Sequence, residues 1–263
     1  MLGLLAALAS LPAAAAGPTG WGGGSCREVT AFPANLSEPG VYCLSFKHID
    51  FPLMSGALIT ISADHVVFDM NGATLDGTPK GTPTSTTWGI LAARNHTNIT
   101  VRNGTVKGFN YGVSLQGALG SVDSVRQSHS YLIENMRVIN SRSIGIQLIG
   151  NDSEIRDTYV AHTGGSSDPS VAPSAWGMFL AGTGLRLVNN DVAFTHVNTT
   201  GTGGVTYGMF LGGAHDSIAV NNRITEATHG IFSTLPNWGK YRDNVTVNVS
   251  VPYTGGTDIG NNN

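Results

Sequence analysis

Gly177-Met178-Phe179-Leu180 decides the fold, because this order of glycine, apolar residue, any residue and small or apolar residue returns along the chain. The spacings between successive glycines are 23, 33, 32, 31 and 22 residues. The short spacings indicate the basic unit, and the long ones add about ten inserted residues. A repeat of this length is typical of a solenoid, in which each unit buries its face against its neighbours. The other copies begin at Gly89, Gly112, Gly145, Gly208 and Gly230.

Each unit also contains a second pattern, of which Ile133-Glu134-Asn135-Met136-Arg137-Val138 is one copy. Apolar residues at period two flank a turn, which predicts strand, turn and strand. No segment has a sustained helical period with caps, so the helical solenoids are excluded. Short parallel strands stacked coil upon coil predict a β-helix, with neighbouring coils about 4.8 Å apart.

Equivalent side chains of a β-helix form columns along its axis. The residues at the turn of the second pattern predict one such column, an inner ladder of side chains that hydrogen-bond to one another and to the turn backbone. A row of ligands is the alternative interpretation of the same column. Its members are Asn71, Asn103, Asn135, Asp157, Asn189 and Asn221.

The coil length, the glycine-led strand and the asparagine column resemble the right-handed parallel β-helix superfamily, the pectate-lyase-like fold. The resemblance covers roughly residues 56–248 and implies an all-β, single-stranded right-handed parallel β-helix of about seven or eight coils. We expect the β-helix domain at 56–263, after an N-terminal cap segment at 17–55 that is similar to the first coil of exported bacterial β-helix proteins. The superfamily contains lyases, glycoside hydrolases, esterases, epimerases and adhesins, so the resemblance does not assign an activity.

The composition favours an exported globular protein. Of 263 residues, 12% are charged and 41% are hydrophobic, which argues against disorder. The net charge of -3 supplies no basic field for phosphates, so nucleic acid is not expected as a partner. Residues 1–16 fit a signal peptide, with a buried N-terminal helix as the alternative, and no other segment is long and apolar enough to span a membrane. The expected location is therefore secreted or periplasmic.

The two cysteines, Cys26 and Cys43, follow the predicted cleavage site closely. In an oxidising compartment they are expected to form one disulfide, whereas two buried thiols are the alternative. No CxxC motif or nearby pair of histidines completes a zinc site. The sequence therefore predicts a disulfide and no metal ligand, and it leaves any cofactor open.

The glycine-led strand also predicts a surface. Its residues alternate, so the one after each glycine points inward and the next points outward. Phe179, Phe210 and Phe232 then form an outward aromatic stripe, which is either a contact surface or a satellite core under a loop. The outward column contains Leu91, Ser114, Gln147, Phe179, Phe210 and Phe232.

Insertions precede three of these strands, at 77–87, 164–175 and 198–206, and insertions grouped on one edge often build a binding face. They end in Trp88, Trp176 and Tyr207, which either anchor the loops or supply aromatic walls for sugar rings. The predicted partner is a polysaccharide or another extended glycan. The residues expected to bind it are Gln147, Trp176, Phe179, Phe210 and Phe232.

Two kinds of cleavage chemistry can be considered. Hydrolysis needs two carboxylates about 5–10 Å apart, and Asp152 and Asp216 lie at similar coil positions but are also ordinary turn residues. Elimination on a uronic-acid polymer needs a base for the C5 proton and a cation for the carboxylate, or calcium held by six to eight oxygens. No acidic cluster lies on the expected binding strand. The candidate catalytic residues are Tyr207 or His229 as the base and Lys240 or Arg242 as the neutralising cation.

Two functions therefore remain open. One is a polysaccharide-active enzyme, an eliminase rather than a hydrolase, acting along the aromatic stripe. The other is a non-catalytic glycan-binding or cell-surface solenoid that uses the same surface. The absence of the paired-Asp and His motifs of polygalacturonases and of the Asp-Pro-His motif of alginate epimerases favours the second.

Overall fold

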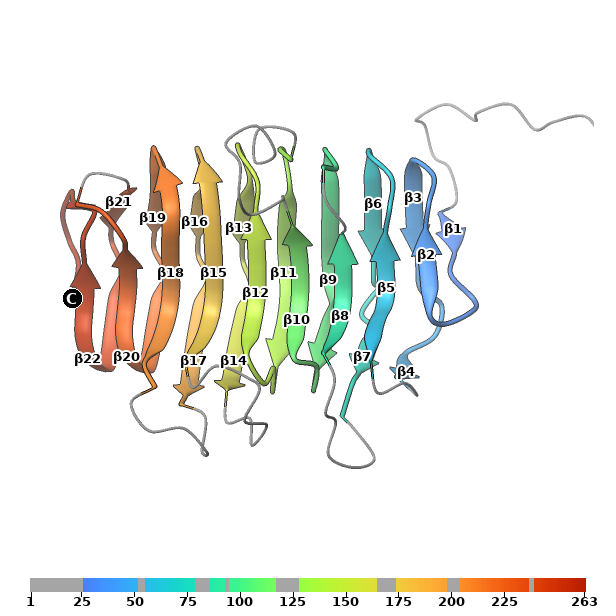
Figure 1. Ribbon diagram of the computed structural model, residues 1–263, viewed down its shortest axis with the longest axis horizontal. Coiled ribbons are helices and arrows are strands. Elements are labelled where there is room, and N and C mark those ends of the chain that lie inside the picture. Colours follow the sequence, from blue (N-terminus) through green and yellow to red (C-terminus); the bar gives the residue numbers. More distant parts are fainter. Residues whose placement is uncertain are drawn as a thin grey trace, which may run out of the picture.

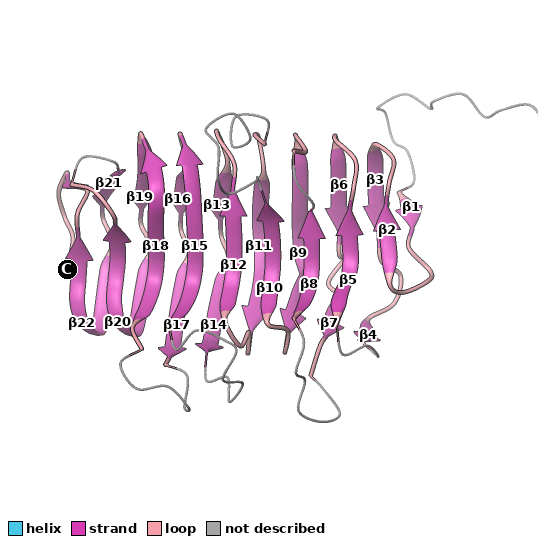
Figure 2. Cartoon of the chain, in the orientation of Figure 1, coloured by secondary structure: helices cyan, strands magenta, loops and turns pink. Residues whose placement is uncertain are grey.

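The computed structural model describes residues 26–51, 55–78, 86–92, 95–116, 128–164, 174–197, 204–236 and 239–263. In these ranges the chain forms strands joined by turns and bends and contains no helix (Figure 2). The described residues therefore include no helix that is long and apolar enough to cross a bilayer. The predicted signal peptide at 1–16 lies outside the described residues. The coils follow one another along the long axis, from β1 at the N-terminal end to β22 at the C-terminal end (Figure 1).

The strands form three parallel stacks, which we call sheets A, B and C in the order in which each coil visits them. Every pairing joins a strand to the equivalent strand of the next coil, as the sequence repeat predicts. The fold is an all-β, right-handed parallel β-helix.

Sheet A consists of β2 (Ala34–Leu36), β5 (Gly56–Ile61), β8 (Thr87–Ala92), β10 (Tyr111–Gln116), β12 (Ile144–Ile149), β15 (Ala175–Thr183), β18 (Thr206–His215) and the C-terminal parts of β20 (Arg223–Ser233) and β22 (Val245–Thr254). Sheet B consists of β1 (Arg27–Glu28), β3 (Gly40–Cys43), β6 (Val66–Asp69), the N-terminal parts of β9 (Ile99–Lys107) and β11 (Leu132–Ile139), β13 (Glu154–Arg156), β16 (Arg186–Val188), β19 (Ser217–Val220), β21 (Gly239–Arg242) and β23 (Thr257–Asp258). Sheet C consists of β4 (His48–Asp50), β7 (Thr74–Asp76), the C-terminal parts of β9 and β11, β14 (Tyr159–Gly164), β17 (Asp191–His196) and the N-terminal parts of β20 and β22.

The core follows the predicted alternation. The apolar residue after each repeat glycine is in register with its equivalents and at most 1% exposed. Branched and aliphatic side chains of sheets B and C close the interior from the other two sides. The sheet A members of this core are Ile90, Val113, Ile146, Met178, Met209 and Ile231.

The repeat glycines face the interior, where sheet C leaves no space for a side chain. A Cβ atom at Gly145 would lie 2.4 Å from Cγ1 of Val160 and 2.5 Å from the carbonyl oxygen of Gly177. A Cβ atom at Gly177 would likewise lie 2.4 Å from Cγ1 of Val192, which belongs to the same coil. The glycine is therefore required by close packing between sheets, and these two glycines have no positive φ.

The predicted asparagine column exists, but its inner position is wrong. Asn135 and Asn189 adopt φ angles of 50° and 57° at the bend from sheet B to sheet C, and their side chains are exposed. The amide of Asn135 donates to Oδ1 of Asn103 at 2.8 Å, and that of Asn221 donates to Oδ1 of Asn189 at 2.8 Å. This outer ladder is thus a surface feature that stabilises left-handed bends.

The inner ladder begins one residue later. Asn190, Asn222 and Asn244 are 2%, 1% and 0% exposed. Oδ1 of Asn222 accepts the backbone N–H and the amide of Asn190, both at 3.0 Å. Asn222 in turn donates its own N–H and amide to Oδ1 of Asn244 at 2.9 and 3.0 Å. These side chains satisfy the backbone groups that the bend leaves unpaired.

The N-terminal segment belongs to the same stack. β1 pairs with β3 and β2 pairs with β5, so parallel pairing begins upstream of the boundary expected at residue 56. Cys26 and Cys43 form the predicted disulfide, with their Cα atoms 5.7 Å apart. The disulfide fastens the first strand of the stack to β3.

Candidate functional site

The three phenylalanines of the predicted stripe line up on the outer face of sheet A. Phe179 and Phe210 stack with ring centroids 5.3 Å apart and planes inclined by 14°. Phe210 and Phe232 stack at 5.3 Å and 5°. The strand register joins the same three residues on consecutive coils, β15, β18 and β20. Parallel pairing therefore turns sequence spacings of 31 and 22 residues into a continuous row of rings.

A second column of rings runs beside the first. Trp176 stacks on Tyr207 at 6.2 Å and 7°, and Tyr207 stacks on His229 at 5.1 Å and 13°. The two columns meet edge to face, for example Tyr207 against Phe210 at 5.0 Å and 76°. We call these six residues the ring array, and all six are half-buried. Its members are Trp176, Phe179, Tyr207, Phe210, His229 and Phe232.

The ring array lies beside the connections from sheet C to sheet A. Trp176, Tyr207 and His229 each precede the repeat glycine, near the start of the sheet A part of the strand. The predicted insertions lie mostly outside the described residues, but their flanks are in register, with Thr87 paired to Gly56 and Ala175 paired to Thr206. All three insertions therefore leave and rejoin the coil at the same edge, as expected.

Two further rings lie in register with the second column toward the N-terminus, but Ile144 separates them from Trp176. Trp88 and Tyr111 stack at 5.6 Å and 20°, and burial raises the pKa of Tyr111. Among the described residues, the indole N–H groups of Trp88 and Trp176 are buried without a hydrogen-bond partner. Sequence reasoning placed both tryptophans at loop ends, and the structure places them in register with the ring array.

His229 is a titratable member of the ring array whose pKa is shifted by burial. Its Nδ1 atom is buried and has no hydrogen-bond partner in the described part of the chain. Burial lowers the pKa of His229 below its ordinary value of 6.5, because the charged imidazolium is poorly solvated there. The imidazole is therefore neutral at neutral pH and has a nitrogen that can accept a proton.

This pKa shift predicts a loss of stability in acid. The unfolded chain binds a proton at His229 more readily than the folded chain, so stability falls as the pH falls below about 6.5. We expect the thermal midpoint of the wild type to decrease more between about pH 7.5 and about pH 5 than that of His229→Phe. Equal decreases in the two proteins would show that His229 does not carry the effect.

Gln147 occupies the phenylalanine column one coil before Phe179. Its side chain is buried, and Oε1 accepts hydrogen bonds from Ser114 Oγ at 2.8 Å and from Gln116 Nε2 at 3.0 Å. The column thus changes from aromatic rings to a buried polar cluster at this coil. Gln147 lies in line with the ring array, as predicted, but its amide oxygen is already engaged.

Lys240 and Arg242 do not join the ring array. Both belong to β21, which pairs with β19 and β23 in sheet B, and their exposed side chains face outward from that sheet. Arg242 lies 3.5 Å from Asp243. The structure therefore brings Tyr207 and His229 together but not the two cations predicted to act with them.

The two aspartates considered for hydrolysis and two further histidines also lie away from the array. Asp152 and Asp216 are exposed left-handed residues at the bend from sheet A to sheet B, beyond the other end of the sheet A strands. His162 stacks on Phe194 at 4.9 Å on sheet C. His196 lines a hollow of about 320 Å³ at the edge between sheets C and A.

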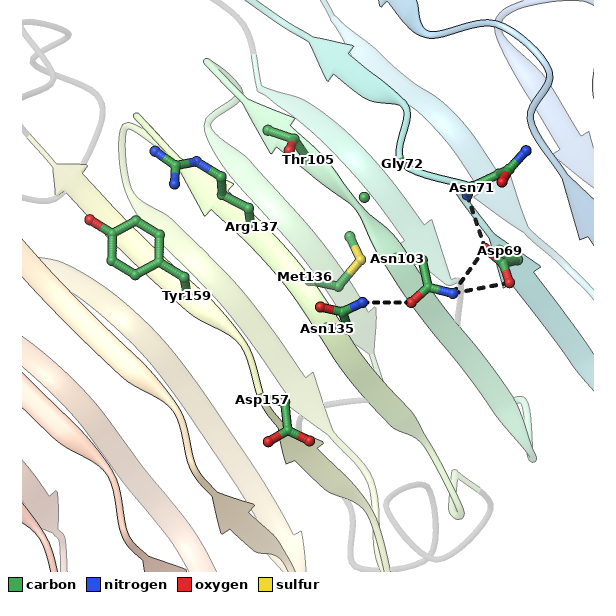
Figure 3. Close-up of a pocket in the computed structure, with 11 residues that line it drawn as sticks. Asp69, Asn71, Gly72, Asn103, Thr105, Asn135, Met136, Arg137, Asp157 and Tyr159 are labelled. Atoms are coloured by element: carbon green, nitrogen blue, oxygen red, sulfur yellow. Dashed lines mark hydrogen bonds between the residues drawn. The ribbon is translucent and has the colours of Figure 1, made fainter.

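Sequence reasoning missed Glu226, which lines the same hollow and accepts a hydrogen bond from Asn248 Nδ2 at 2.6 Å. It also missed a larger groove of about 630 Å³ at the bend between sheets B and C (Figure 3). Asn135, Arg137 and Tyr159 are among the residues that line the groove. Only the outer asparagine column pointed to that part of the surface.

One group of described residues has the geometry of a partial metal site. Ligand atoms of His48, Asp50 and Asp76 lie within 4.8 Å of one another on sheet C near the N-terminal end. Asp76 already pairs with Lys107 Nζ at 2.7 Å, which supplies a positive charge to this carboxylate. The group is separate from the ring array.

No protein-family model and no curated protein sequence matches the chain. Among solved structures, the complex of XylC with xylose has a TM-score of 0.53 at 12% identity, over 79% of this chain and 38% of that chain. The enzymatically active domain of bacteriophage CBA120 tailspike protein 2 has a TM-score of 0.47 at 14% identity, over 86% of this chain and 38% of that chain. The chain thus spans 38% of the length of each of these two proteins. At 12% identity the likeness to XylC concerns the fold alone, which is that of a right-handed parallel β-helix.

Proposed function

We propose that this protein binds an extended glycan along the ring array. The observation that supports the proposal is the double column of six half-buried rings, which repeats on three consecutive coils. The C–H faces of sugar rings pack on aromatic faces, and a column that follows the solenoid axis suits a chain-like ligand. XylC, which shares the fold, was solved with xylose.

The disulfide and the predicted signal peptide support a location outside the cytoplasm, where extended glycans are abundant. Disulfides form and persist in oxidising compartments. We therefore propose that the mature protein is secreted or periplasmic. Mass spectrometry of the exported protein would test cleavage after residue 16.

Binding without cleavage is the form of this proposal that the geometry supports best. The neutral imidazole of His229 could accept a proton, but elimination on a uronate also needs a cation beside the carboxylate. In the described residues, the sheet A parts of the strands contain no lysine or arginine, and Lys240 and Arg242 lie on sheet B. The lyase is therefore the second candidate, supported by the proton-accepting nitrogen of His229.

Phe210→Ala is expected to weaken glycan binding about tenfold or more, because Phe210 is the central ring of its column. Phe194→Ala is the matched control, since Phe194 is an exposed phenylalanine on sheet C, in the coil that carries Phe179. Calorimetric titration with neutral and acidic oligosaccharides measures both. Equal affinities for wild type and Phe210→Ala, or equal losses in the two variants, would contradict the proposal.

The same oligosaccharides distinguish binding from elimination. Incubation of the protein with polyuronates is expected to give a complex and no new ultraviolet-absorbing unsaturated ends. If unsaturated ends appear and are lost in Tyr207→Phe or His229→Gln, the lyase replaces the binding module as the function. If no glycan binds, both candidates fail.

A further inference from the structure

The groove at the bend between sheets B and C has the composition of a second binding site. It has a volume of about 630 Å³ and runs across consecutive coils, so that equivalent residues line it at successive levels (Figure 3). The outer asparagine ladder forms one side, and residues at the start of sheet C form the other. Its lining includes Asn71, Asn103, Thr105, Asn135, Arg137 and Tyr159.

Arg137 indicates that the ligand of this groove is an anion. Arg102, Arg156 and Arg223 each lie within 2.9 Å of a carboxylate oxygen. In contrast, no carboxylate among the described residues lies within 4.0 Å of Arg137. Its guanidinium carbon lies 5.0 Å from the centroid of the Tyr159 ring, which fixes the side chain at the groove without neutralising its charge. The guanidinium can therefore donate its paired N–H groups to an anion.

The acidic residues of the groove are already engaged. Asp69 accepts hydrogen bonds from Arg102 Nε at 2.9 Å and from the amide of Asn103 at 3.1 Å. Burial alone would raise the pKa of Asp69, but these bonds and the backbone N–H of Asn71 outweigh it and lower the pKa. Asp157 accepts the amide of Asn189 at 3.2 Å. Arg137 is thus the cation that the groove offers to a ligand.

The rest of the lining suits a sugar. The amide of Asn135 donates to Oδ1 of Asn103, which leaves the Asn135 carbonyl oxygen for a hydroxyl donor. Thr105 supplies a hydroxyl, and Tyr159 supplies a ring beside the cation. A carboxylate fits the guanidinium in a two-pronged arrangement, and hydroxyl groups fit the amides.

We infer that this groove binds the carboxylate of an acidic sugar, with Arg137 as the charged anchor. The site is separate from the ring array and does not depend on the function proposed for it. It also supplies a cationic partner for a uronate, which the described strands of sheet A lack. A glycan with carboxylates would therefore be held on the face that carries the asparagine column, for which the sequence left a row of ligands as the alternative interpretation.

The test uses the full chain, labelled with ¹⁵N, and titrates it with trigalacturonate, its methyl ester and a sulfated neutral trisaccharide. We expect trigalacturonate to shift the signals of Asn135, Arg137 and Tyr159. The methyl ester should bind with an affinity lower by about tenfold or more, because it lacks the charge. Tighter binding of the sulfated sugar would overturn the assignment to a carboxylate.

Arg137→Gln is expected to weaken trigalacturonate binding at the groove about tenfold or more, and Arg137→Lys should retain part of the affinity. Arg186→Gln is the control for net charge, since Arg186 is exposed on sheet B outside the groove, and it should change the affinity less than about twofold. Because Arg137 is exposed, thermal midpoints should confirm that its variants fold.

Phe210→Ala separates this inference from the proposed function. It should leave the shifts at Asn135 and Arg137 unchanged even if it abolishes shifts at the ring array. Absence of shifts at the groove, or equal affinities for Arg137→Gln and Arg186→Gln, would overturn the inference whatever the ring array binds.

Discussion

Replacing Asn222 with leucine is expected to destabilise the β-helix by about 3 kcal/mol or more. The substitution keeps the size of the side chain but removes the acceptor for two donors of Asn190 and the donor to the carbonyl oxygen of Leu187. These groups are buried, and each buried polar group left without a partner costs about 1–3 kcal/mol. Urea unfolding followed by circular dichroism measures the loss.

Two variants calibrate this prediction. Asn222→Thr should be milder, because Thr158 occupies the equivalent position two coils earlier and donates its hydroxyl to the carbonyl oxygen of Arg156. Asn221→Gly should be nearly neutral, since glycine adopts the left-handed φ of 54° readily and only an exposed hydrogen bond is lost. A large loss in Asn221→Gly and a small one in Asn222→Leu would show that the outer ladder, rather than the inner one, stabilises the bend.

Gly145→Ala is expected to destabilise the protein by about 3 kcal/mol, although it adds one carbon atom. The new Cβ would lie 2.4 Å from Val160 Cγ1 and 2.5 Å from the carbonyl oxygen of Gly177. The second contact is with backbone that is hydrogen-bonded on the next coil, so a change of rotamer does not relieve it. The strands must move apart, which weakens the packing of sheets A and C over neighbouring coils.

Gly239→Ala is the matched control for this prediction. Gly239 is also a buried strand glycine, but a Cβ there would meet atoms no closer than 3.6 Å. Alanine should therefore be tolerated, or slightly stabilising, because it reduces the entropy of the unfolded chain. If the two substitutions have equal effects, the repeat glycine is not required by contact between sheets.

The sequence predicted the phenylalanine column because strand alternation and coil register are the same in every repeat. Phe179, Phe210 and Phe232 each stand two residues after a repeat glycine, and parallel pairing preserves that offset. The second column was not predicted as a column. The alternation is interrupted at the repeat glycine, because Gly177 and Met178 are both buried. Trp176 and Phe179 therefore share an outer face although they are three residues apart.

The offset of the asparagine ladder could not be predicted from alternation. Asn189 and Asn190 are adjacent, and either could point inward if the strand were straight. The left-handed φ of 57° at Asn189 turns that residue outward and directs Asn190 into the core. A left-handed residue interrupts the period of two, and the sequence does not show which asparagine of the pair adopts it.

The position of the candidate cations shows a second limit of predicting spatial neighbours from the sequence. Lys240 and Arg242 follow Phe232 closely in the sequence, which predicted that they flank the ring array. Phe232 lies on sheet A, whereas Lys240 and Arg242 lie on β21 of sheet B. In a solenoid with short strands, neighbours in sequence often lie on different faces, whereas residues about 22 to 32 positions apart share one.

The parallel register of β15, β18 and β20 gives the ring array an approximate translational symmetry. A polymer with a short repeating unit could occupy several nearly equivalent positions along it, each shifted by one coil. Such degeneracy raises the number of bound states and lets a long ligand slide with small barriers, so apparent affinity should rise with polymer length even when each contact is weak. Duplicating the coil that carries Tyr207 and Phe210 would add one more pair of rings to the ring array and lengthen the binding surface by one coil.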